Sequence, residues 1–172
     1  NTTKQVIVRP LGPSLAGMGI ANVLADPPLE LHHGTGALLA TNNDWQTAPN
    51  EQEIIDAGLA PTDPNESVIL MTLPATSSGS GYTAVIHGVG GTGGNGLVEV
   101  YDLDSGPGSA LPNLSPRGNV HAGDDVLIGG FIVLENGSPR GPLRALWPTP
   151  GPTGRRFVRG PSRWAVRWVQ SI

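Results

Sequence analysis

The sequence predicts an all-β fold, an antiparallel β-sandwich of the jelly-roll-like kind, with one short helix and a C-terminal β arm. Glycine accounts for 25 and proline for 17 of the 172 residues, whereas only 14% of the residues are charged. This usage is far from that of a helical bundle. The hydrophobic residues occur in short runs bounded by turn residues, as in strands, and the length fits one domain with one core.

Eight segments have the composition of strands, being short and rich in Val, Ile, Leu or aromatic residues. A hairpin is predicted at His33–Gly36, between the second and the third, and glycine- and serine-rich turns at Thr76–Gly81 and Gly90–Gly96 separate the fourth, fifth and sixth. Strands at such regular spacing indicate a sandwich. In chain order the segments are Gln5–Arg9, Leu29–His32, Ala37–Thr41, Ser67–Leu73, Tyr82–Gly88, Leu97–Leu103, Val126–Leu134 and Trp164–Val169.

The core of this sandwich is predicted from the alternation of apolar residues along the strands, since successive side chains point to opposite faces of a sheet. The predicted core residues are Val6, Val8, Leu31, Ile69, Val85, Val98, Val100, Ile128 and Ile132.

One segment, Glu51–Ala57, has the pattern of a helix. Asn50 is placed to cap its N-terminus, with Glu53 reaching back to complete a capping box, and Gly58 is placed to end it. The helix is short, so we expect it to cover one end of the sandwich.

Charge is divided unevenly along the chain. Residues 1–139 contain all 14 acidic residues and only three cations, and so carry −11; residues 140–172 contain seven arginines and no acid, and so carry +7. We therefore distinguish a β-sandwich body, residues 1–139, from a basic Pro/Arg/Trp-rich C-terminal arm, residues 140–172. An acidic body repels phosphate, so nucleic acid is not an expected partner, and no apolar run approaches the roughly 20 residues that a membrane-spanning helix needs.

The arm ends in an amphipathic strand. Trp164, Val166 and Trp168 share one face, and Arg163 and Arg167 lie on the other. Burying the three apolar side chains contributes on the order of 5–9 kcal/mol gross, so the strand is expected to dock on a sheet. Two interpretations remain open: the strand closes its own sandwich, or it fills an open edge of a neighbouring subunit as in donor-strand complementation.

The second interpretation draws on three sequence features. The arm and the body have opposite charges, and proline-rich Pro148–Pro152 provides a linker. In addition, Leu143–Thr149 repeats the pattern of Val8–Ser14, so the C-terminal segment resembles one that already fits this fold. A head-to-tail contact of this kind that does not close into a ring builds an open filament.

The best candidates for metal ligands are carboxylates and amides that could bind Ca²⁺ through oxygen. Asp102-Leu103-Asp104-Ser105-Gly106 is only half of a calcium loop and lacks a distant bidentate Glu, so turn residues after a strand explain it as well. No cofactor is expected otherwise. The weak Ca²⁺ candidates are Asp102, Asp104, Asp124 and Asp125, together with Asn42, Asn43 and Asp44.

Catalysis is not expected. His32, His33, His87 and His121 have no metal-site spacing, and Ser14 lacks the Gly-x-Ser-x-Gly context of a nucleophile. The chain contains no cysteine. Formal glycosylation sequons begin at Asn1, Asn65, Asn113 and Asn136, and ordinary turn formation accounts for them equally well.

Several sequence segments resemble the tandem β-sandwich repeats of large secreted and surface-anchored bacterial proteins and, more distantly, the bacterial pre-peptidase C-terminal domain. The resemblance implies an extracellular, non-catalytic domain used for spacing, anchoring or adhesion. In that family the strand resembling Asp125–Val133 precedes the one resembling Val6–Arg9, so this chain is permuted relative to it. The matching segments are Val6–Leu15, Leu24–Trp45, Leu59–Leu73, Gly81–Leu103 and Leu114–Val133, and they do not extend to residues 150–172.

Together these features predict a secreted structural subunit that assembles head to tail into an extracellular filament, with copies of itself as partners. The chain begins at Asn1 without a methionine, which fits either a mature secreted or cell-surface protein whose signal has been removed or simply a shortened chain. The alternative is a monomeric accessory or carbohydrate-binding module of a larger cell-surface protein. In that alternative surface glycans are the partners, and Trp45 or Trp147 serves as the sugar-stacking platform.

Overall fold

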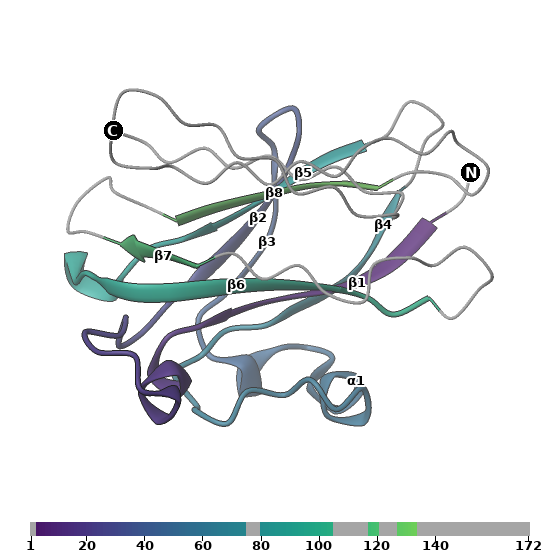
Figure 1. Cartoon of the computed structure of the whole chain (residues 1–172). Coiled ribbons are helices and arrows are strands. Elements are labelled where there is room, and N and C mark those ends of the chain that lie inside the picture. The colour runs from purple at the N-terminus through teal and green to yellow at the C-terminus, as the bar shows by residue number, and fades with distance from the viewer. Residues whose placement is uncertain (1–2, 75–79, 105–116, 121–126, 134–172) are drawn as a thin grey trace.

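The structure is a computed structural model, and it describes residues 3–74, 80–104, 117–120 and 127–133. Side chains are described for the first two ranges and for Val120. The fold is a two-layer antiparallel β-sandwich, as the sequence predicts, with little helix (Figure 1). The basic arm, including Trp164–Val169, lies outside the described residues.

The first sheet has the strand order β4-β1-β6-β7, where β4 is Ile69–Pro74, β1 is Thr3–Leu11, β6 is Gly94–Asp102 and β7 is Arg117–Val120. Central β1 pairs along its length with both β4 and β6. The strand β7 was not predicted from the sequence.

The second sheet has the order β3-β2-β5-β8, where β3 is Leu38–Asn42, β2 is Leu29–His33, β5 is Ser80–Ile86 and β8 is Leu127–Val133. The predicted hairpin joins β2 to β3, and the pairing contains a β-bulge where the register shifts between Leu31 and His32. Every connection except β2–β3 and β6–β7 passes from one sheet to the other, so the turns predicted around β5 connect the two layers.

The main core lies between the sheets, and six of the nine predicted core residues are in it: Val6, Val8, Leu31, Ile69, Val98 and Val100. The prediction for Val85 was wrong. Tyr82, Ala84 and Ile86 are the residues of β5 that are buried, so Val85 lies on the other face of its sheet, half-buried. The side chains of Ile128 and Ile132 lie outside the described part.

The outer face of the first sheet carries a second, smaller core under the helix α1, Glu51–Asp56. Ile7 points outward from β1 and packs with Ile54 of α1 and with Val68, all of them essentially inaccessible to solvent. Figure 1 shows α1 on the side of this sheet that faces away from the other sheet. The central strand β1 is therefore buried on both faces, which explains its unbroken apolar run.

The bounds of α1 agree with the prediction to within one residue, but its predicted N-terminal cap is wrong. Gly58 takes a left-handed φ of 68° just after the helix, a conformation that favours glycine. Asn50 makes no side-chain cap, so the predicted capping box does not form. The Asn50 amide instead donates to the Leu70 carbonyl oxygen at 2.9 Å, which ties the helix entrance to β4.

Candidate strand-acceptor groove

The described part of the sandwich has a groove along one side, between the edge strand β3 of one sheet and the edge strand β4 of the other. The end of β3 lies close to the residue before β4: the Asn42 side-chain oxygen accepts a hydrogen bond from the Val68 backbone N–H at 2.9 Å. The groove measures about 210 Å³, and it is lined by Ala40–Asn42, Ala48–Asn50 and Val68–Met71.

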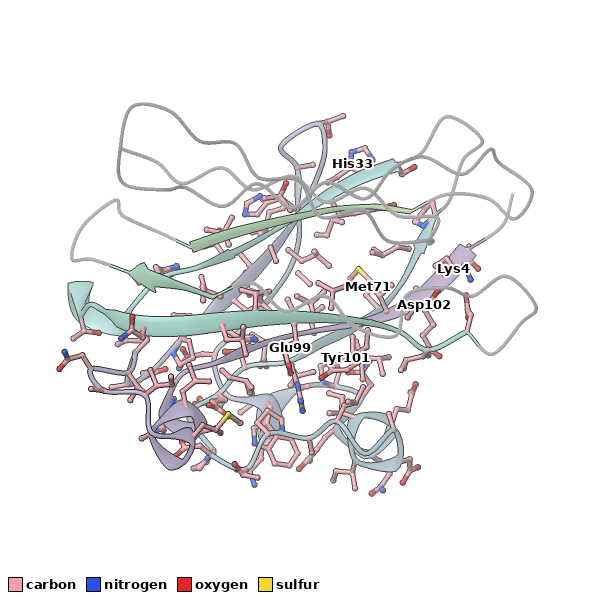
Figure 2. The ribbon with its side chains drawn as sticks, viewed as in Figure 1. Lys4, His33, Met71, Glu99, Tyr101 and Asp102 are labelled. Atoms are coloured by element: carbon pink, nitrogen blue, oxygen red, sulfur yellow. The ribbon has the colours of Figure 1, made fainter. Side chains whose placement is uncertain are left out.

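The lining of this groove is mainly apolar and is continuous with the main core. Ala40 and Met71 are half-buried and pack against the core cluster from opposite sheets. Figure 2 shows Met71 in the space between the two sheets. An engineered apolar cavity of about 150 Å³ is large enough to bind benzene, so the groove has room for an aromatic ring.

The β4 side of the groove has few free backbone groups. Alternation along an antiparallel strand sends the backbone groups of Leu70, Thr72 and Pro74 away from β1 and toward the open edge. The Leu70 carbonyl already accepts from the Asn50 amide, and the Val68 N–H already donates to Asn42. Pro74 has no N–H to offer.

The β3 side is different. The Gly34 N–H donates to the Gly81 carbonyl at 2.7 Å, and this bond shows which backbone groups of β2 point toward β5 and which point toward β3. By alternation, Ala40 and Asn42 bond to β2, whereas Leu38 and Thr41 present their backbone groups to the open edge. The side chains of Leu38 and Leu39 are 54% and 39% exposed.

Acidic residues lie before and after Ala48–Asn50, the segment between the two strands that also lines the groove. Asp44 precedes Ala48–Asn50, and the first turn of α1 contributes Glu51 and Glu53 immediately after it. The arm residues predicted to make the polymer contact, Trp164, Val166, Trp168, Arg163 and Arg167, lie outside the described residues.

The predicted Ca²⁺ candidates Asp102 and Asp104 surround a lysine. The Lys4 ammonium is 3.4 Å from Asp102 and 3.3 Å from Asp104, and Lys4 is 6% exposed. Figure 2 shows Lys4 and Asp102 at the same end of the sandwich, on neighbouring strands. A protein cation therefore occupies the position between these two carboxylates. Asp124 and Asp125 lie outside the described residues.

The amide-rich candidate segment Asn42–Asp44 has structural roles. Besides accepting from Val68, Asn42 donates to the Asp44 carbonyl at 3.0 Å, and the Asn43 carbonyl accepts from the Ser67 hydroxyl at 2.8 Å.

Burial, and then the nearby Asp44 charge, raise the pKa of Asp26 above its usual 3.8. The described residues contain no group of three or more histidines and carboxylates suited to holding an ion.

Ser14 and the histidines do not form a catalytic arrangement within the described residues. The Ser14 hydroxyl donates to Glu66, and the same fully buried carboxylate accepts from the Gly12 and Ser14 N–H groups at 2.9 Å each. Glu66 thereby anchors the 3₁₀ helix η1, Pro13–Met18. His32 pairs with Glu30 at 2.8 Å, and His33 packs edge-on against Tyr82.

The structure also bears on the predicted glycosylation sequons and on the tryptophans proposed to stack against sugar. Asn65 is exposed, but the Ser67 of its sequon is fully buried; Asn1, Asn113 and Asn136 lie outside the described residues. Trp45, which the alternative interpretation expects to be exposed, is half-buried against the second core. Trp147 also lies outside the described part.

Comparison of the chain with protein-family models, with curated proteins and with solved structures finds no match in any of the three. Among the described residues, no helix has both the length and the apolar character needed to cross a bilayer.

Proposed function

We propose that the protein is a secreted structural subunit that assembles head to tail into an extracellular filament, the C-terminal arm of one copy entering the groove of the next. The single observation that carries this proposal is the apolar groove between the edge strands β3 and β4, where Ala40 and Met71 of the lining pack against the main core. An extended strand added at such an edge gains backbone pairing from the sheet and side-chain burial from the groove.

The arm has the sequence that this groove requires. A strand needs apolar residues at every second position to fill the groove, as Trp164, Val166 and Trp168 are spaced. Its other face carries Arg163 and Arg167, which complement the acidic body. Each copy would contribute one arm and one groove, so the contact is heterologous and repeats without closure.

The test compares the full chain with a variant that lacks residues 155–172, by light scattering. We expect the full chain to form assemblies whose mass grows with concentration, and the freshly prepared truncated chain to be monomeric. The truncated chain should also be less stable, and should aggregate only slowly, through its unfilled edge, after it is prepared. Trp168→Ala should weaken assembly strongly. Trp147→Ala, a matched change outside the strand, should leave it close to that of the unmodified chain.

The alternative of a monomeric accessory or adhesion module makes the opposite forecast. If the arm folds back onto its own body, the full chain runs as a monomer at all concentrations. That result would overturn the filament proposal.

A further inference from the structure

We infer that β3, and not β4, is the strand edge that receives the arm, so that an incoming strand extends the sheet β3-β2-β5-β8. This inference rests on the proposed function, because it takes the arm of a second copy as the occupant. It adds which of the two sheets the incoming strand extends, and which backbone groups form hydrogen bonds to that strand. The presence of a groove alone does not determine either.

The first argument is that β4 is protected against strand addition. The Leu70 carbonyl, which alternation brings to the outer edge of β4, accepts from the Asn50 amide at 2.9 Å, and the N–H of Val68, the residue before β4, donates to Asn42 at 2.9 Å. Pro74 has no N–H at the next edge-facing position after Thr72. Side-chain caps and proline are devices by which proteins prevent edge strands from pairing.

The second argument is that β3 lacks such protection within the described residues. Leu38 and Thr41 present backbone groups outward, and no described side chain binds them. The exposed Leu38 and Leu39 add apolar surface next to these groups. The bulge in the β2–β3 pairing interrupts the alternation, which accounts for two consecutive leucines being exposed.

The third argument comes from geometry and charge. A strand paired with β3 would place every second side chain over the groove, beside Ala40 and opposite Met71, where the arm offers its tryptophans. Its other side chains would lie beside Thr41, on the face where Glu30 is paired with Thr41 in the neighbouring strand. The arginines of the arm would lie on the same face as the Glu30 carboxylate, which also pairs with His32 at 2.8 Å.

The chain offers a matched pair of test variants. Thr41 and Thr72 are both exposed threonines with edge-facing backbone groups, Thr41 on β3 and Thr72 on β4. Proline at such a position removes an edge N–H without breaking a bond to the inner strand. In the full chain, Thr41→Pro should lower the amount of assembly at a fixed concentration by at least tenfold, and Thr72→Pro should change it less than twofold. Circular dichroism confirms that each variant is folded.

A second measurement does not depend on the proline variants folding. The chain has no cysteine, so introduced cysteines are unique. Thr41→Cys protein is mixed under oxidising conditions with protein carrying Ala165→Cys or Arg167→Cys in the arm, because a disulfide needs Cα atoms within about 7 Å. We expect disulfide-linked dimers with one of the two arm variants, and none when Thr72→Cys replaces Thr41→Cys.

The outcomes separate the inference from the proposed function. If Thr72 variants block assembly and capture the arm while Thr41 variants do not, β4 is the acceptor and the inference is wrong. If both pairs are without effect although removal of residues 155–172 abolishes assembly, the arm assembles the filament by another contact, and the inference alone falls. If that truncation changes nothing, the proposed function fails and this inference fails with it.

Discussion

Charged side chains inside this sandwich are held by partners that lie far away in the sequence. Asp102 and Asp104 have the spacing of oxygen ligands, yet the register of β1 against β6 places Lys4 between them. Strand register depends on the tertiary fold, so the sequence alone could not distinguish a metal site from an ammonium site. The same applies to Glu66, whose three hydrogen bonds reach back to Gly12 and Ser14.

The Lys4 site leads to a prediction on stability. Lys4→Met removes the ammonium from the Asp102 carboxylate, whose side chain is 2% exposed, and should lower the free energy of unfolding by about 3–5 kcal/mol. Asp104→Asn, at a side chain that is 36% exposed, should cost less than about 1 kcal/mol. Urea denaturation measures both. The double variant Lys4→Met/Asp102→Leu should regain most of the loss; if it is no more stable than Lys4→Met, the ion pair does not explain the effect.

Asp26 leads to a prediction on pH. Burial, then Asp44, raise its pKa, so the folded state holds the proton more tightly than the unfolded state does. The stability that Asp26 contributes is therefore complete below about pH 3.8 and is lost as the pH rises through the folded pKa. Asp26→Asn should raise the melting temperature at pH 7, and the gain should shrink toward pH 3. A lower melting temperature at pH 7 would contradict this explanation.

Strands with a strong alternation of apolar residues could be predicted from the sequence. Elements whose formation or orientation depends on pairing with other strands could not. The strand of Arg117–Val120 contains Arg, Gly and Asn, which have weak strand preference, and it forms by pairing with β6. In β5 both faces contain apolar residues, so alternation could not decide between Val85 and its neighbours. In the structure the face of β5 that carries Tyr82 points into the core: Tyr82 is buried, and its hydroxyl donates to the Pro74 carbonyl at 2.8 Å.

The helix α1 offers a comparison between two adjacent isoleucines. Ile54 is fully buried against the outer face of the first sheet, whereas Ile55 is 43% exposed. Ile54→Ala should cost about 2–5 kcal/mol through lost burial and a cavity. Ile55→Ala should stay within about 0.5 kcal/mol of the unmodified protein. Thermal denaturation measures both changes, and equal effects would mean that α1 is not anchored as described.

At the scale of the whole molecule, the sandwich is asymmetric. One sheet has a second core beneath α1, and the groove between β3 and β4 opens at the side. The sequence predicted a sandwich with an amphipathic arm, but it contained no signal for the groove, because Ala40 and Met71 come from strands in different sheets. It also gave no sign that Asn42 and Asn50 cap β4, since each hydrogen bond joins residues far apart in the chain.

The central claim is that one copy of the chain holds the next, and sedimentation velocity of the full chain over a range of concentrations tests it most directly. We predict species far larger than the 17.8 kDa chain, whose size increases with concentration without stopping at a fixed oligomer. Raising the ionic strength should slow their appearance, because it screens the attraction between the basic arm and the acidic body. A single 17.8 kDa species at every concentration and salt would contradict the account.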